Sequence, residues 1–376
     1  ETRTVTFSNI EEKNNTLELF SGNLILSTKR NEEERKYSIK VEFNGDGEYF
    51  VNSINITDKA NNKTNVEGKE NTDFNFIIDG KGSEGTISVE KISGTWSTFL
   101  KIITFNIFAD EETLQVDLKG RDNTSGVDYI QYLTSPKAYT EEELKSIQKW
   151  ETKETEGEEV LLEQSLNVNA NSQFVEYLKV VDNAGNISYF SSDGVIQDIA
   201  EPEWLKAEIF NGNESDYYTQ DVRIDLRIQD PLRTNTVKPL DEEASEDTYS
   251  GLADLWYTVS ATQIVNEQTG EITDNSKTVY LIKDGKIQSD ENASKIQMFE
   301  KSIVIPADEF NSNNVTVTLH ATDKAGNEAE NKEFSFIIDK TKPQIDLSYE
   351  DALGDASIGY FMERRNATVK SEAKRS

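Results

Sequence analysis

The sequence predicts an all-β protein in which several antiparallel β-sandwich domains follow one another in an elongated array. Two observations carry this prediction: a sequence pattern that occurs three times, and strand-like segments on both sides of each copy. The copies are INITDKANNKT (54–64), LKVVDNAGNIS (178–188) and LHATDKAGNEA (319–329). At 376 residues the chain also exceeds the length of one ordinary domain, so about two to four domains are expected.

The recurring pattern predicts a tight turn between two strands. Its centre reads Asp-x-Ala-(Gly or Asn)-Asn, in which the Asp accepts backbone N–H groups and the Gly or Asn adopts a left-handed conformation. Gly185 and Gly326 stand where the first copy has Asn61, the usual non-glycine residue for that conformation. The segment VTVTLHAT (315–322) alternates between apolar and polar residues, as in a strand with one buried face.

Each turn is followed by another strand-like segment and a linker, which places domain boundaries near residues 80, 200 and 340. The predicted domains are 1–80, 81–200, 201–340 and 341–376, the last being the start of a further repeat. The two middle domains also share a second pattern, in which DLKGRD and SGVDYIQY of one match DLRIQD and SGLADLWY of the other.

The two ends of the chain resemble each other. ERRNATV (363–369) is similar to ETRTVTF (1–7), so we expect the first domain to lack its first strand. Either the ends mark an arbitrary boundary, or the strand region 343–369 of one copy fills the missing strand of another.

Three local elements are predicted within the middle domains. A short helix is expected over 141–150, with Thr140 as its N-cap and Glu143 completing a capping box. The insert 231–249 separates the two halves of the second pattern and is predicted to be a surface loop. The stretch 261–285 is predicted to form a long hairpin that projects from its domain.

The composition narrows the classes of partner. The chain has 39 Lys and Arg against 70 Asp and Glu, a net charge of −31, which repels phosphate backbones and anionic membranes. Nucleic-acid binding and membrane insertion are therefore not expected, whereas divalent cations, cationic partners and neutral glycans remain open. There is no cysteine, which excludes disulfides, thiol catalysis and cysteine-held metals. No signal peptide or membrane-spanning stretch is recognisable, so the chain is either cytosolic or part of a longer exported protein.

The sequence argues against an enzyme. Its single histidine, His320, falls on the predicted solvent face of a strand, which disfavours a catalytic triad or a zinc site. The run from Gly80 to Gly85 fits G-x-G-x-x-G, but a strand pattern follows it where a nucleotide site needs a helix. Short-turned sandwiches also rarely offer the cleft that a glycosidase carboxylate pair requires.

Calcium is the leading ligand hypothesis because aspartates recur at equivalent places in the repeats. Calcium binds several carboxylate and carbonyl oxygens, and a domain junction gathers such oxygens from two domains. The alternative is that these side chains only bond backbone N–H groups in turns and linkers. The candidates are the strand-end residues Asp79, Asp198 and Asp339 and the turn residues Asp58, Asp182 and Asp323, with Asp122 and Asp230 recurring in the middle pair.

Aromatic residues and a covalent staple give further alternatives. An intramolecular Lys–Asn isopeptide bond needs a buried acid beside the pair, and the sequence does not identify such a trio. The apolar segment Phe99–Phe108 is expected to pack against the preceding domain. Six further aromatic residues either form a platform on which a sugar stacks or pack in the sandwich cores and junctions. They are Trp96, Trp150, Trp204, Trp256, Tyr217 and Tyr218.

The quoted motifs resemble the bacterial immunoglobulin-like repeats of large cell-surface proteins of Gram-positive, clostridial-type bacteria. The similar pieces are D-x-A-G-N before the last strand, I-D-K-T-x-P at the linker, and the D-x-x-S-G-V/L strand pair. The resemblance implies tandem immunoglobulin-like sandwiches in an extracellular, adhesive stalk that spaces a binding domain from the cell wall, to which regions outside this chain attach it. One alternative is that 201–340 itself binds a glycan or host protein; a second is an accessory region of a secreted glycan-degrading enzyme.

Overall fold

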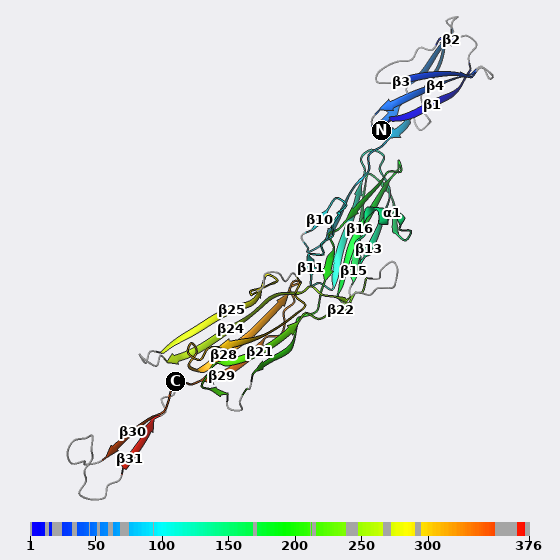
Figure 1. Ribbon diagram of the computed structural model, residues 1–376. Coiled ribbons are helices and arrows are strands. Elements are labelled where there is room, and N and C mark those ends of the chain that lie inside the picture. The colour runs from blue at the N-terminus through cyan, green and yellow to red at the C-terminus, as the bar shows by residue number, and fades with distance from the viewer. Residues whose placement is uncertain are drawn as a thin grey trace, which may run out of the picture.

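The computed structural model shows four β-regions that follow one another along an extended chain (Figure 1). It describes residues 2–11, 15–16, 25–31, 36–44, 46–50, 53–58, 63–67, 75–92, 94–167, 171–210, 212, 216–237, 247–265, 272–289, 295–349 and 367–372. For most of 2–75 and 346–372 only the backbone path is described. Every strand pairing joins two strands that belong to the same β-region.

The first region contains three small antiparallel sheets, with strand orders β1-β4-β3, β2-β6-β7 and β5-β8. The turn that contains Asn61 lies outside the described residues, and the expected absence of a first strand stays a prediction. The strands are β1 (Thr2–Glu11), β2 (Asn15–Thr16), β3 (Ile25–Asn31), β4 (Lys36–Asn44), β5 (Gly47–Phe50), β6 (Ser53–Asp58), β7 (Lys63–Glu67) and β8 (Asn75–Ile78).

The second region is a sandwich of two sheets, ordered β10-β9-β12-β15 and β11-β18-β16-β13-β14, with β17 also pairing with β16. Alternate residues of β12 are buried, as the period-two pattern of a half-buried strand requires. The strands are β9 (Glu84–Val89), β10 (Thr95–Trp96), β11 (Ile107–Ala109), β12 (Thr113–Arg121), β13 (Val127–Ser135), β14 (Glu151–Gly157), β15 (Glu159–Asn167), β16 (Ser172–Asp182), β17 (Ile187–Ser191) and β18 (Val195–Gln197).

The third region repeats this architecture, with sheets ordered β19-β21-β27 and β20-β29-β28-β24-β25-β26. A short parallel pair, β20 with β29, corresponds to β11 with β18 in the second region. The strands are β19 (Glu203–Ile209), β20 (Tyr217–Tyr218), β21 (Val222–Gln229), β22 (Arg233–Thr234), β23 (Asp247–Thr248), β24 (Leu252–Val265), β25 (Ile272–Lys283), β26 (Lys286–Ile287), β27 (Met298–Ile305), β28 (Ser312–Asp323) and β29 (Lys332–Ile338). A final hairpin consists of β30 (Gln344–Tyr349) and β31 (Ala367–Glu372).

The all-β, tandem-sandwich prediction is confirmed, and so are the predicted hairpin and helix. Strands β24 and β25 pair as far as Val265 and Ile272. Helix α1 (Glu141–Ser146) begins at Thr140, which accepts from Glu143 N while the Glu143 side chain accepts from Thr140 N. The helix ends before residue 150 because Ile147 adopts an extended conformation. No helix in the described part of the chain is long and apolar enough to cross a membrane.

The sequence led us to expect that the segment Phe99–Phe108 packs against the preceding domain, and among the described residues this prediction is wrong. Phe99, Ile103 and Phe105 instead cover the outer sheet face of their own sandwich, in a small cluster that includes buried Leu133 and Tyr177. The segment is held there by Asp193, whose carboxylate accepts from Thr104 N and Oγ1 at 2.8 and 2.7 Å. The extra aromatic residues therefore build a second core layer under α1.

Among the described side chains of the second sandwich, one glutamate is fully buried. Glu176 lies on β16 and accepts hydrogen bonds from Thr134 Oγ1 at 2.7 Å and from Gln164 Nε2 at 2.8 Å. Gln164 belongs to the facing sheet, so the carboxyl group ties the two sheets together. Burial raises the pKa of Glu176 to about 8, against the opposing effect of the two hydrogen bonds. Its partners are a threonine and a glutamine, so the trio of a Lys–Asn isopeptide staple is not assembled around this acid.

We expect Glu176→Gln to change the pH dependence of the second sandwich. Because the folded-state pKa is raised from 4.5 to about 8, the folded form keeps a proton that the unfolded form loses between these values. Wild-type stability therefore falls as pH rises from 5 to 8, by on the order of a few kcal/mol. The neutral variant lacks this component, so the difference in unfolding free energy between the two proteins should vary with pH. Denaturant unfolding at several pH values measures it; exposed Glu163→Gln is the control, and a constant difference contradicts the assignment.

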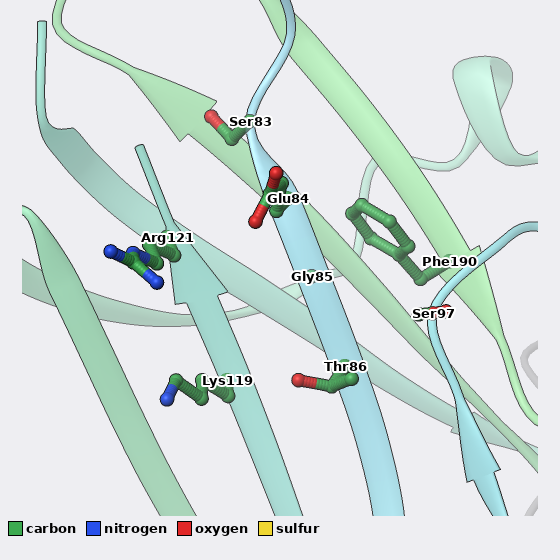
Figure 2. A pocket seen from close by; sticks show the side chains of 8 residues that line it. All are labelled: Ser83, Glu84, Gly85, Thr86, Ser97, Lys119, Arg121 and Phe190. Carbon is green, nitrogen blue, oxygen red and sulfur yellow. The ribbon is translucent and has the colours of Figure 1, made fainter. Parts of the chain in front are cut away.

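Gly85 on β9 gives a second test of this core. A Cβ built there would clash with the ring of Phe190, which lies beside the strand (Figure 2). Gly85→Ala should therefore lower the unfolding free energy by about 1–3 kcal/mol, as overpacking does. At Gly212 the nearest atom would be 3.5 Å away, so Gly212→Ala is the matched control and should be nearly neutral. Equal effects of the two substitutions in denaturant unfolding would show that the ring is not closely packed.

Candidate aspartate sites at the domain junctions

Among the described residues, six buried aspartates form two clusters, one at the junction of the first and second repeats and one at the junction of the second and third. In each cluster the three residues offer carboxylate oxygens that all lie within 4.8 Å of one another. The clusters are Asp79, Asp122 and Asp182, and Asp198, Asp230 and Asp323. We call them the first and the second junction cluster. None of the six side chains is more than 6% exposed.

Each junction cluster draws its aspartates from two repeats. Asp79 and Asp198 end the last strand of one repeat, directly before the linker. The other members belong to the following repeat: one follows β12 or β21, and the other ends β16 or β28 at the recurring turn. Equivalent positions in the two repeats therefore converge on equivalent sites. The sequence pointed to the junctions but did not show which three aspartates meet there.

The recurring turn has the predicted chemistry. Asp323 Oδ1 accepts from the backbone N–H groups of Gly326 and Asn327 at 2.8 and 2.9 Å, and Gly326 has a φ of +104°. Asp182 Oδ1 likewise accepts from Asn186 N at 2.8 Å, beside Gly185 at +88°. The turn thus fixes the rotamer of the aspartate that enters each cluster.

The last asparagine of the turn reaches across the junction. Asn186 Nδ2 donates to the Asp79 carbonyl at 3.1 Å, and Asn327 Nδ2 donates to the Asp198 carbonyl at 2.8 Å. Both also donate to the turn aspartate of their own repeat. Each asparagine therefore joins the end of one sandwich to the turn of the next. Sequence reasoning assigned these residues only a turn role, although their recurrence marked them.

The Ser-Gly pair before β13 and β24 makes the second connection. Ser125 Oγ donates to Asp79 Oδ2 at 2.7 Å, and Ser250 N donates to Asp198 Oδ2 at 2.7 Å. Asp122 Oδ1 in turn accepts from three backbone N–H groups of residues 124–126, and Asp230 Oδ2 accepts from Gly251 N. Asp230 Oδ1 accepts no hydrogen bond from the described residues, although it is buried.

The insert 231–249 strengthens the second junction. Within its described part, Asn235 is buried and its Nδ2 donates to the Gln173 carbonyl of the preceding repeat at 3.3 Å. Val237 packs against the core of that repeat. Part of the predicted surface loop is therefore a contact between two sandwiches.

The electrostatics of the second junction cluster reflect the crowding of its carboxylates. Burial, together with the nearby charge of Asp198, raises the pKa of Asp230 to about 7. Burial also raises the pKa of Asp323 to about 6, against the hydrogen bonds from Asn327. Two carboxylates about 5 Å apart repel by roughly 3 kcal/mol at an effective dielectric constant near 20. A group of three such charges needs a compensating cation or bound protons.

The other predicted metal candidates lie elsewhere. Asp339 Oδ1 accepts from Thr341 N at 2.9 Å, the same linker turn that Asp79 makes with Lys81 and Asp198 makes with Ala200. The residues 350–366 beyond it lie outside the described part. The side chain of Asp58 also falls outside it. The structure thus brings Asp79 and Asp182 together with Asp122, and Asp198 and Asp323 together with Asp230.

The aromatic residues divide between core and surface. Trp96, Trp204 and Tyr218 pack against the main cores, and Trp150 packs in the outer layer under α1. Tyr217 is exposed.

Trp256 stacks on His320 with ring centroids 5.0 Å apart, and on Tyr280 at 5.9 Å. His320 lies on the solvent face of β28, as predicted, and its Nδ1 is 2.9 Å from Asn331 Oδ1. Since both faces of the Trp256 ring contact neighbouring rings, this stack does not offer that ring to a sugar.

A shallow groove crosses β9 and β12 on the second sandwich (Figure 2). Phe190 lies beside the β9 strand next to Gly85, while Lys119 and Arg121 lie on the adjacent strand. Lys119 pairs with Glu159 at 2.7 Å and Arg121 Nε donates to Asn123, so both cations are engaged. The run Gly80–Gly85 that borders this groove leads into strand β9, as expected, and not into a helix.

The chain was compared with protein families, curated proteins and solved structures. No curated protein matches the chain. Among solved structures, the chain is similar to a tetra-tandem repeat from the extending region of a large adhesion protein, at 10% identity and a TM-score of 0.34, over 93% of this chain and 73% of that one. It is also similar to the fibronectin(III)-like modules of Clostridium thermocellum CbhA (10% identity, TM-score 0.23, 68% and 95% covered). A further match is an α-L-rhamnosidase of Streptomyces avermitilis (9%, 0.18, 66% and 24%). Residues 214–340, almost the whole third repeat, match the family model of the bacterial Ig-like domain.

Proposed function

We propose that this chain is a structural stalk module of an extracellular bacterial protein, and that it has no catalytic role. Its repeats hold a binding domain away from the cell wall, to which regions outside this chain attach the protein. The Gram-positive, clostridial-type origin implied by the sequence resemblance is part of the proposal.

The observation that carries this proposal is the interlocked junction. A flexible linker would let neighbouring sandwiches rotate freely, as in most chains of loosely joined domains. Here the strand-end residue of one repeat is bonded by a turn asparagine and a serine of the next, and this arrangement occurs twice. A repeated, fixed junction transmits direction along the chain, which is what a stalk requires.

The alternative in which 201–340 binds a glycan or host protein has less support. Part of its insert is used at the second junction, and the Trp256 stack is closed by its neighbouring rings. No specific observation favours an accessory region of a glycan-degrading enzyme.

Small-angle scattering of the whole chain tests the stalk proposal. A compact chain of this length would have a radius of gyration of about 21 Å. We expect a value about twice as large, with a rod-like profile. A compact profile would contradict the proposed function.

The double variant Asn186→Ala, Asn327→Ala should loosen the junctions. Each substitution removes the hydrogen bond to the preceding repeat, so the scattering profile should shift from that of a rod towards that of a flexible chain. Exposed Asn65→Ala is the control and should leave the profile unchanged. If the double variant scatters like wild type while circular dichroism shows both folded, the asparagines do not hold the junctions.

A further inference from the structure

The two junction clusters have the donor chemistry of a hard divalent cation. Their side-chain donors are carboxylate oxygens alone, without histidine or cysteine. Such donors suit calcium or magnesium better than zinc or copper. Calcium accepts six to eight oxygens in flexible geometry, so three aspartates with one oxygen each can supply up to about half of its ligands.

A second observation points to a ligand at the second cluster. Asp230 is fully buried, and its Oδ1 is unpartnered while Oδ2 is held by Gly251 N at 2.5 Å. A buried carboxylate oxygen without a partner costs free energy unless it is neutralised or coordinated. The equivalent residue of the first cluster, Asp122, accepts three backbone hydrogen bonds from the described residues, each on Oδ1.

Within the described part of the chain, no Lys, Arg or His side chain neutralises either cluster. None of the six carboxylates forms an ion pair with Lys, Arg or His among the described residues. Lys295 is close enough to sense Asp230 and Asp198, but its ammonium lies over the Tyr249 ring, 4.1 Å from the centroid. The backbone and asparagine donors around the clusters orient the carboxylates without cancelling their charge.

We propose that each junction cluster binds one Ca²⁺ ion, which joins two consecutive repeats through three aspartate carboxylates. The ion replaces mutual repulsion by attraction between residues that belong to different sandwiches. Calcium therefore stiffens both junctions together. The stiffening rests on the proposed stalk function, whereas binding does not.

Calorimetric titration of the chelator-treated whole chain with CaCl₂ tests the binding. We expect two sites per chain, with dissociation constants below about 1 mM, the weak end for extracellular calcium modules. Asp122→Asn and Asp230→Asn should each remove one site, and the double variant both. Exposed Asp128→Asn, which lies outside the clusters, should retain two. Circular dichroism without calcium establishes that each variant is folded.

The outcomes separate the two proposals. Absence of binding heat overturns the calcium proposal, and it leaves the stalk intact if scattering still shows a rod. Two sites retained in the folded double variant place calcium elsewhere and also overturn it. MgCl₂ binding as tight as CaCl₂ overturns the assignment to calcium. A compact chain that binds two calcium ions through these residues supports the sites and contradicts the stalk.

Discussion

The arrangement of this protein depends on how the last strand of one sandwich is received by the next. That strand ends in an aspartate whose carbonyl and carboxylate both serve as acceptors for the following repeat. An asparagine side chain donates a hydrogen bond to the carbonyl, and the Ser-Gly segment donates one to the carboxylate. Since these acceptors would otherwise be buried without partners, neighbouring repeats cannot separate or rotate without a cost in hydrogen bonds. The carboxylate of this aspartate also lies close to two aspartate carboxylates of the following repeat. The three negative charges repel one another unless a cation or bound protons compensate them.

The second sandwich has two features besides its main core: an outer aromatic layer and a buried glutamate. The outer layer formed by Phe99, Ile103 and Phe105 packs on an outer sheet face of the second sandwich. Glu176 places a titratable group between the sheets of the same repeat. Both features belong to the second repeat, whereas the junction chemistry is shared by the second and the third. The junction contacts therefore connect consecutive repeats, whereas the outer layer and Glu176 belong to the packing of one sandwich.

Much of this could be predicted from the sequence because the relevant signals are local. Alternation along β28, the capping box at Thr140 and the Asp-x-Ala-Gly-Asn turn each depend on neighbouring residues. The recurrence of aspartates also pointed to the junctions, and the wider set of eight candidates contained all six cluster members.

The features that the sequence did not predict depend on contacts between segments that are distant in the chain. No local pattern in Phe99–Phe108 indicates which sheet face the segment covers. Gly194 adopts a positive φ and lies against Phe105, and the sequence did not predict this contact. The contact of Asn235 with Gln173 likewise joins segments 62 residues apart. The convergence of three aspartates was expected only as a general outcome, since periodicity does not state distances between strands.

The most direct test of the fixed junction is a distance measurement between the second and third repeats. The chain has no cysteine, so two introduced ones, at exposed Glu163 and Lys301, can carry spin labels without other changes. Pulsed electron paramagnetic resonance should then give one narrow distance distribution in the presence of calcium. A broad distribution from a folded protein under the same conditions would show that the two sandwiches move independently, and it would contradict this account.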